Sequence, residues 1–261
     1  MKEYVATDIA ELIRAIIEIT RGQENSQQWW RGHADVKWSL VPSLYRRGFE
    51  SKESNINARF MMKAKPRYPN CPSNSDAFSW LFLMQHYRLP TRLLDWSESP
   101  LVAMYFAIAA DAGHGTDGAL WALTPTGLNL HQLKREAICM PGSSELRKLA
   151  RDAFLGNKEG PDRRILSVLT EQTDLRHMVQ QSVFTIHGCA TPINELPESS
   201  AYLAKIRIPV TVKPAFQQVL TLFGISRSGL FPDLENLAAE LGSLDFVLRA
   251  AETAQTDRLR D

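Results

Sequence analysis

Cysteine is scarce in this chain, with three in 261 residues. Cys71, Cys139 and Cys189 are far apart, and they form neither a CxxC pair nor the spacing of a zinc site. An odd number of widely spaced cysteines excludes a disulfide framework as the basis of the fold. The simplest interpretation is three free thiols in a reducing compartment, so we expect a cytoplasmic protein.

Long apolar runs are also missing. No stretch reaches the roughly 18 apolar residues that a membrane-spanning helix requires. The longest run, Leu101–Ala110, is short enough to be a buried helix. The N-terminal residues Met1–Tyr4 lead directly into an amphipathic segment and lack the apolar core of a signal peptide. We therefore expect no membrane partner.

The excess of either charge is small, because 30 basic residues face 29 acidic ones for a net charge of +1. This balance excludes a global attraction to nucleic acid, although a local basic patch stays compatible with it. Hydrophobic residues make up 44% of the chain, which suffices for a substantial core. We predict one domain over residues 1–250, followed by a polar tail, residues 251–261.

Several catalytic and cofactor motifs are missing as well. The chain has no GxxxxGK[ST], HExxH or GxSxG sequence, and no GxGxxG precedes a helix. Its six histidines include no pair at i and i+4, so we predict no metal site. Without a glycine-rich turn between a strand and a helix, a doubly wound nucleotide-binding fold is disfavoured.

Helical and strand patterns alternate irregularly along the chain, which predicts an α+β fold with a mixed, mainly antiparallel sheet flanked by helices. Period-two alternation predicts strands at Gln27–Arg31, Ala119–Leu123, Gln181–His187 and Tyr202–Ile208. Apolar spacing and start signals predict helices at Asp8–Arg21, Glu50–Lys63, Asp76–His86, Ser99–Ala112, Asn129–Ala137, Ser144–Leu155, Pro214–Phe223 and Leu234–Leu248. We expect Arg88–Trp96 to be an irregular crossing.

Polar side chains that suit a binding site gather first at the predicted strand that ends at Arg31. A guanidinium makes paired, charge-assisted hydrogen bonds to phosphate or carboxylate. Gly32, the next residue, has no side chain and lets the backbone approach a ligand closely. The alternative is that Arg31 forms a salt bridge with a carboxylate at the edge of the core, such as Asp95.

A second polar segment, Gln85–Trp96, lies between two strongly apolar helices and should form a connected hydrogen-bond network. His86 is the natural acid–base candidate near neutral pH, and Asp95 could orient His86 or Arg92. The alternative is a structural latch between the helices. Farther along the chain, Gln181 either points into the same cleft from the start of its strand or is exposed to solvent.

The chain resembles the FRG-domain family in five segments, one of which is Trp38–Leu44. Trp30–Gly32 stands in place of the Phe-Arg-Gly signature, and Gln85–Ala107 is similar to a His-Tyr-Gly-Leu-Pro-Thr-Arg-Leu-Leu-Asp-Trp block with Arg88 in place of glycine. Gln181–Phe184 and Phe231–Leu234 resemble two later motifs, so the similarity covers roughly residues 5–240. The resemblance implies a toxin or phage-defence effector with an antitoxin or another defence-system partner.

A more distant resemblance, to mono-ADP-ribosyltransferases, follows the order of Arg31–Gly32, Asp95–Ser97 and Gln181 in this chain. It implies an ADP-ribosyltransferase-like sheet, NAD as co-substrate, and nucleic acid or protein as acceptor. Gln181 stands where that family has a catalytic glutamate, so either Asp95 supplies the negative charge or the activity is a different one. The resemblance implies catalytic roles for Arg31, His86, Asp95 and Gln181, and cofactor binding by Arg31, Gly32, Tyr87, Thr91, Arg92, Trp96, Ser97 and Tyr105.

Within that scheme, Arg31 would hold the pyrophosphate of NAD, and Tyr87 or Trp96 would stack on the nicotinamide ring. Two other functions fit the same residues. The chain could bind or process nucleic acid, with Trp29 or Trp38 stacking on bases and phosphate contacts from the basic residues Arg46, Arg47, Lys63, Lys65, Arg67, Arg163 and Arg164. It could also sense a nucleotide without turning it over.

Overall fold

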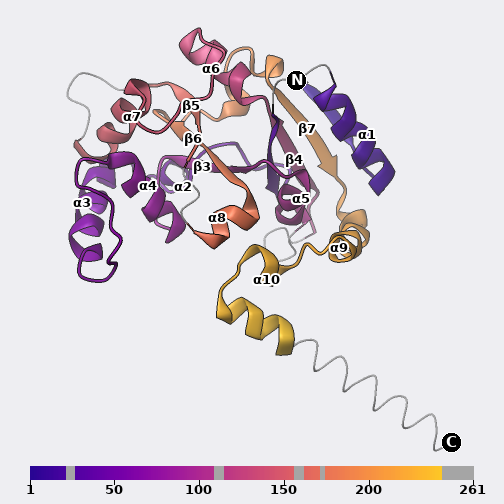
Figure 1. Cartoon of the computed structure of the whole chain (residues 1–261). Coiled ribbons are helices and arrows are strands. Elements are labelled where there is room, and N and C mark those ends of the chain that lie inside the picture. Colours follow the sequence, from indigo (N-terminus) through magenta and orange to yellow (C-terminus); the bar gives the residue numbers. More distant parts are fainter. Residues whose placement is uncertain (22–26, 109–114, 156–161, 171–173, 243–261) are drawn as a thin grey trace, which may run out of the picture.

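A seven-stranded sheet forms the centre of the computed structural model, which describes residues 1–21, 27–108, 115–155, 162–170 and 174–242 (Figure 1). The strand order is β1-β7-β4-β2-β3-β6-β5. β1 runs parallel to β7, and the other neighbouring pairs are antiparallel. The strands are β1 (Lys2–Val5), β2 (Trp29–His33), β3 (Leu93–Ser97), β4 (Gly118–Leu123), β5 (Ile165–Val168), β6 (Ser182–His187) and β7 (Leu203–Ile208).

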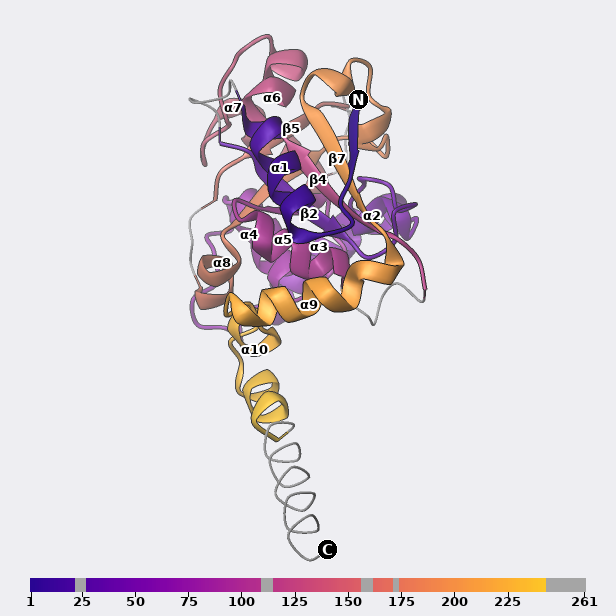
Figure 2. The same cartoon turned by 90° about the vertical axis from the view of Figure 1, so that its right-hand side faces the viewer.

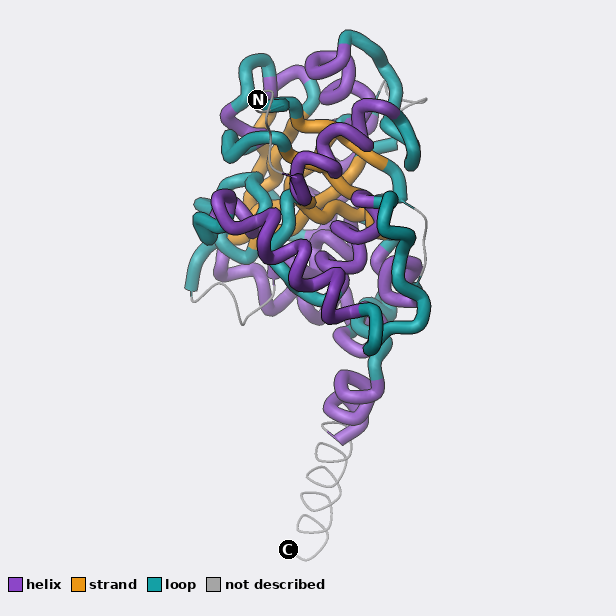
Figure 3. Tube along the Cα trace, turned by 90° about the vertical axis from the view of Figure 1, so that its left-hand side faces the viewer, coloured by secondary structure: helices purple, strands orange, loops and turns teal. Residues whose placement is uncertain are grey.

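The described helices surround this sheet, which confirms the predicted α+β class with a mainly antiparallel sheet (Figures 2 and 3). They are α1 (Ile9–Thr20), α2 (Ser43–Arg46), α3 (Glu53–Ala64), α4 (Ala77–His86), α5 (Pro100–Ile108), α6 (Pro125–Leu133), α7 (Ser144–Leu155), α8 (Leu175–Gln180), α9 (Lys213–Leu222) and α10 (Arg227–Leu230). Residues 234–242 are helical too. Among the described residues, no helix combines the length and hydropathy that crossing a membrane requires.

The prediction of an irregular crossing at Arg88–Trp96 was wrong, because Leu93–Ser97 is the strand β3. This strand lies between β2 and β6 and is buried at every position except Asp95. A strand with neighbours on both edges and apolar contacts on both faces shows little alternation in its sequence, and so its periodicity does not reveal it. The strands β1 and β5 were not predicted, because each has four residues and so is too short to show a clear alternating pattern.

Some helix boundaries also differ from prediction. Pro125 starts α6 at a position where proline is favoured, four residues before the predicted start at Asn129. The helix ends at Leu133, since Lys134 adopts a left-handed conformation. The short helices α2, α8 and α10 were not predicted. The predicted helix ends at Ala112 and Leu248, and the predicted tail at residues 251–261, lie outside the described residues.

Two sets of helices cover different halves of one sheet face. Residues of α1, α5 and α9 pack on β7, β4 and β2 in one core cluster. Residues of α4 and α7 pack on β3, β6 and β5 in another. The opposite face carries a third cluster, which includes Trp29, Trp96, Trp121 and Leu128 of α6. The boundary between the two helix sets therefore falls at β2 and β3, where Arg31 and Asp95 lie.

Position 32 requires glycine because the backbone of α5 packs directly against it. A Cβ atom at this position would lie 1.9 Å from the carbonyl oxygen of Ala103 and 2.5 Å from the backbone nitrogen of Ala107. Both atoms belong to α5, which crosses directly over β2. The close approach that we expected of a ligand is thus made by the backbone of α5 at this position.

We predict that Gly32→Ala lowers the free energy of unfolding by about 2–3 kcal/mol, because the added methyl group must displace a helix backbone. The matched control is Gly229→Ala, where the nearest atom to the new Cβ is the Ser226 hydroxyl at 3.5 Å, an ordinary contact. Urea unfolding of both variants measures the difference. Equal stabilities would show that α5 can shift freely away from β2.

Candidate functional site

The carboxylate of Asp95 is the most accessible polar group on β3. Its side chain is 52% exposed, although its neighbours in the strand are buried. Gln85, at the end of α4, donates a hydrogen bond from Nε2 to Asp95 Oδ2 (2.8 Å). The Thr91 hydroxyl donates to Gln85 Oε1 (2.6 Å) and accepts from the Leu93 backbone nitrogen (3.1 Å). This chain of hydrogen bonds orients the carboxylate from the backbone outward.

Arg31 lies beside Asp95 at the place where β2 and β3 separate. These two strands are paired through a single residue pair, Trp30 and Ser97. Beyond it, Arg31 Nη1 donates to the Asp95 carbonyl oxygen (2.5 Å) and lies 3.9 Å from Asp95 Oδ2. Arg31 Nε donates to His33 Nε2 (3.0 Å). The guanidinium is therefore fixed on two sides, and its contact with Asp95 is the one that the structural alternative predicts, a salt bridge at the edge of the core.

His33 is held in one tautomer by these contacts. Its Nε2 accepts from Arg31, so the proton is on Nδ1, which donates to the Trp38 carbonyl oxygen (3.1 Å). Burial, followed by the charge of Arg31, lowers the pKa of His33 to about 2. Burial likewise lowers the pKa of His187, which is near Arg31, to about 3. Both rings therefore stay neutral and leave the positive charge to the arginines.

These two histidines should make the protein sensitive to mild acid. The unfolded chain takes up a proton at each of them near pH 6.5, whereas the folded chain does not until about pH 2–3. The free energy of unfolding should therefore fall below pH 6.5, by about 1.4 kcal/mol per histidine between pH 8 and pH 5.5. His187→Gln should remove its share of this dependence, measured by urea unfolding at both pH values. An unchanged dependence would contradict the burial of His187 in neutral form.

Two more guanidinium groups lie within electrostatic range of Asp95. Burial is the main factor that lowers the pKa of both Arg46 and Arg176, and the Asp95 carboxylate counters it in each case. Arg46 Nη1 donates to the Val41 carbonyl oxygen (3.1 Å), and Arg176 lies 4.9 Å from the centroid of the Phe231 ring. With Arg31, they bring three guanidinium groups near the Asp95 carboxylate, and Asp174 and Asp233 also act on Arg176. Arg176 was not predicted, because α8 itself was not.

The two aromatic residues that we expected to stack on a ligand differ in their exposure to solvent. Trp96 is 3% exposed, and its Nε1 donates to Thr185 Oγ1 (3.2 Å), so neither ring face is open to a ligand. Tyr87 is 54% exposed and lies edge-on to Tyr68 and His86. Tyr87 is thus the one of the two that solvent can reach.

Arg92 and His86 have partners other than Asp95. The guanidinium of Arg92 forms a buried bidentate pair with Glu53 and donates from Nη1 to the Leu149 carbonyl oxygen (3.0 Å). This pair joins α3, β3 and α7, as expected of a structural latch. His86 faces Asp174, with 3.2 Å between Nδ1 and Oδ2. Neither side chain is oriented by Asp95, in contrast to the prediction.

Three further predicted site residues lie in or beside β3, α5 and β6: Ser97 ends β3, Tyr105 lies within α5, and Gln181 precedes β6. The Ser97 hydroxyl donates to the Gln180 carbonyl oxygen (2.7 Å) and accepts from the Ser99 backbone nitrogen (3.0 Å). Tyr105 is partly buried and packs against the core cluster that α5 shares with α1 and α9. Gln181 is exposed and ends α8 in a left-handed conformation (φ 46°), and its carbonyl oxygen accepts from the Glu98 backbone nitrogen. The strand β6 begins after Gln181, at Ser182.

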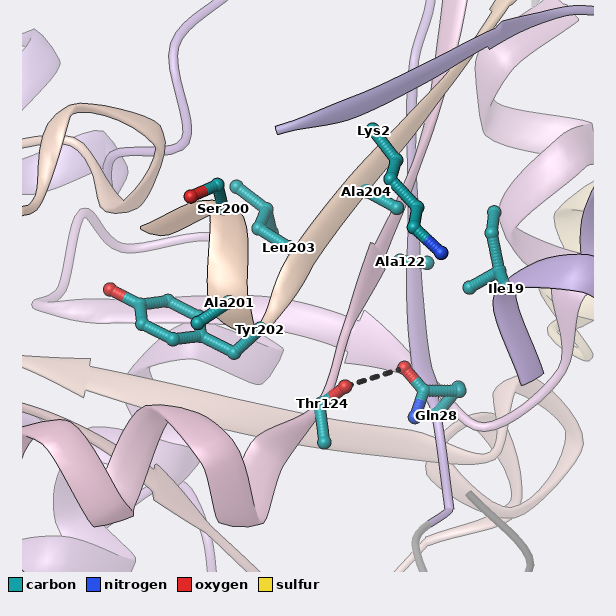
Figure 4. A pocket seen from close by; sticks show the side chains of 10 residues that line it. All are labelled: Lys2, Ile19, Gln28, Ala122, Thr124, Ser200, Ala201, Tyr202, Leu203 and Ala204. Atoms are coloured by element: carbon teal, nitrogen blue, oxygen red, sulfur yellow. Dashed lines mark hydrogen bonds between the residues drawn. The ribbon is translucent and has the colours of Figure 1, made fainter. Parts of the chain in front are cut away.

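A pocket of about 130 Å³ lies elsewhere, beside β7 and β4 (Figure 4). Its walls include Lys2, Ile19 and Tyr202, and Thr124 Oγ1 donates to Gln28 Oε1 (3.1 Å) within it. None of the predicted site residues lines this pocket. Its volume falls below the roughly 300 Å³ at which pockets for small molecules begin, so it does not suit a dinucleotide.

Some of the residues that we expected to contact nucleic acid are buried or paired with other side chains of the protein. Trp29 is fully buried, while Trp38 is 42% exposed. Arg164 forms a bidentate pair with Asp162. Of the proposed stacking residues, Trp38 is therefore the one that a base could reach.

Comparison with known proteins bears on the part of the chain that holds Arg31, Gln85 and Asp95. Residues 26–115 match the family model described as the FRG domain. Comparison with curated proteins and with solved structures gave no match. The matched segment runs from β2 through β3 and α5, the elements that bring the guanidinium and the carboxylate together. The chain therefore contains an FRG domain at residues 26–115, and the candidate site is built mainly from that domain.

Proposed function

We propose that this FRG-domain chain cleaves NAD at the bond between nicotinamide and ribose, as an ADP-ribosyltransferase or a glycohydrolase. The observation that carries the proposal is the half-exposed carboxylate of Asp95 beside the fixed guanidinium of Arg31. Asp95 is held by Gln85, so its charge is oriented before a ligand arrives. Preorganised charge of this kind stabilises a transition state without reorganisation during the reaction.

The charge distribution of NAD matches this surface. Its pyrophosphate is anionic, and its oxidised nicotinamide ring is cationic. Arg46 and Arg176 would attract the pyrophosphate, because guanidinium groups pair well with phosphate. Asp95 would face the cationic end of the molecule, and the exposed ring of Tyr87 offers a surface for stacking. A ligand with anionic groups alone would gain nothing from Asp95.

The reaction breaks the bond between the ribose C1′ and the nicotinamide nitrogen. Both electrons of that bond go to the ring, which leaves as neutral nicotinamide. The positive charge that develops on the ribose is stabilised by the Asp95 carboxylate, the role for which Gln181 lacks a charge. A water molecule or an acceptor group then bonds to C1′ and releases its proton to Asp95 or solvent. Water yields ADP-ribose, and an acceptor yields an ADP-ribosylated product.

The biological setting follows from the same chemistry. Hydrolysis of NAD removes a cofactor that every cell requires, and modification of nucleic acid or protein inactivates the acceptor. Either outcome suits a toxin or phage-defence effector, the role that resemblance to FRG-domain proteins implies. A chain with this activity would need an antitoxin or another defence-system partner to restrain it in its own cell.

Incubation of the chain with NAD tests the proposal. Nicotinamide release is measured by chromatography, with NAD alone and with oligonucleotides or a cell protein extract as acceptors. We expect release that scales with the concentration of the chain. If a folded chain releases no nicotinamide with any acceptor, the catalytic proposal is overturned. A rise in Tm with NAD under those conditions would identify a nucleotide sensor instead.

A further inference from the structure

Two histidines and one aspartate converge at the junction of α4 and α8. His86 ends α4, Asp174 caps the N-terminus of α8, and His177 lies in its first turn. Each side chain offers one ligand atom, and these three atoms lie within 4.8 Å of one another. His86 Nδ1 is 3.2 Å from Asp174 Oδ2, and His177 Nδ1 contacts the same oxygen. The two histidines therefore face one carboxylate oxygen.

The imidazole nitrogens of this cluster are buried and poorly hydrogen-bonded. Neither His86 Nδ1 nor His177 Nδ1 makes a hydrogen bond of acceptable geometry, although both are close to Asp174. The His177 side chain is only 7% exposed. A buried polar atom without a well-formed hydrogen bond costs free energy, so a further partner beside Asp174 would stabilise these two nitrogens.

The surrounding elements hold the three side chains in position. Asp174 Oδ1 accepts from the His177 backbone nitrogen (3.0 Å), which leaves Oδ2 to face the imidazoles. The Phe82 ring packs on the His177 ring with 4.2 Å between centroids. One edge of the cluster is open, since His86 is 26% exposed and Asp174 is 31% exposed. A small cation could enter there while the ligands keep their places.

We propose that His86, Asp174 and His177 bind a divalent transition-metal ion of the zinc class. Imidazole nitrogen and carboxylate oxygen are ligands that zinc accepts at about 2.0–2.2 Å. At that radius, neighbouring ligands lie roughly 3.3 Å apart. His86 Nδ1 and Asp174 Oδ2 are 3.2 Å apart, whereas His177 Nδ1 lies closer to the same oxygen. The proposal departs from the expectation that rested on histidine spacing in the sequence, because the two histidines come from different helices.

The donor set of the cluster suits a metal. His86 and His177 each offer one imidazole nitrogen, and Asp174 offers one carboxylate oxygen. Three protein ligands leave the fourth position of a tetrahedral site open to water or to an anionic group. This inference stands apart from NAD cleavage, because the site is formed by residues other than Arg31 and Asp95.

Calorimetric titration of the chelator-treated chain with zinc chloride tests the site, in the absence of NAD. We expect a single zinc ion per chain in the wild type. Asp174→Asn should weaken binding by at least about 100-fold, since removal of even an outer-shell partner costs 10–100-fold. Asparagine is itself a good helix cap, so this variant keeps α8 in place. Cobalt absorption in the visible range reports the geometry independently.

His131→Gln is the matched control, because His131 Nδ1 also contacts a carboxylate, that of Glu198 (2.7 Å), but without a second histidine. It should bind zinc as the wild type does, whereas His86→Gln and His177→Gln should not. Absence of zinc uptake by the folded wild-type chain would overturn the proposal. Equal affinity of Asp174→Asn and wild type would also overturn it, whatever the NAD assay shows.

Discussion

Asp95→Asn is expected to reduce nicotinamide release from NAD by at least about 100-fold while leaving Tm unchanged. Loss of one preorganised group that stabilises transition-state charge typically costs a factor of about 10²–10³ in kcat. The fold should persist because the Asp95 side chain is half exposed and its carbonyl oxygen, which accepts from Arg31, remains. Asparagine also keeps an oxygen that can accept from Gln85 Nε2. The change therefore removes a charge and little else.

Asp8→Asn is a suitable control for that experiment. Asp8 is also exposed, and it also accepts a hydrogen bond, from the Glu11 backbone nitrogen (2.8 Å), at the start of α1. The same chemical change there should leave nicotinamide release at the wild-type rate. If Asp95→Asn retains full activity, Asp95 does not stabilise the ribose cation. If it lowers Tm sharply instead, the pair with Arg31 is a structural contact and the site interpretation fails.

The sequence indicated which residues belong to this site better than it indicated which of them are in contact. Arg31 and Asp95 were both recognisable from residue type and context, although Arg31 lies in the middle of β2 and not at the end of its strand as predicted. Their proximity depends on β2 and β3 being neighbours, and β3 was hidden because its buried pattern lacks alternation. Gln85 belonged to the predicted network, yet its bond to Asp95 depends on where α4 ends.

The residues that the sequence could not connect come from elements too short to predict. α8 spans six residues, and it supplies both Arg176 near Asp95 and His177 near His86. No local sequence pattern predicts such a helix, because tertiary contacts rather than intrinsic helix propensity stabilise it. The role of Gly32 was likewise hidden, since only the crossing of α5 over β2 shows why no side chain fits there.

Glu53→Gln is expected to lower the free energy of unfolding by about 3–5 kcal/mol, the largest stability effect that we predict. Glu53 and Arg92 form a buried bidentate pair, so removal of the carboxylate leaves a guanidinium with an uncompensated charge in the core. Glu3→Gln is the control: Glu3 is half exposed, and its contact with Lys205 should contribute less than about 1 kcal/mol. Urea unfolding of both variants gives the comparison.

A double variant distinguishes the destabilisation caused by removing one partner from the net contribution of the pair to the free energy of unfolding. Glu53→Leu combined with Arg92→Met removes both charges, and replacement of a buried pair by apolar groups is often close to neutral. We therefore expect the double variant to be more stable than Glu53→Gln alone. Nicotinamide release by each variant should follow its folded fraction, because Arg92 points at Glu53 and Leu149 rather than at Asp95. Loss of release by a fully folded Glu53→Gln would instead place the pair in the functional site.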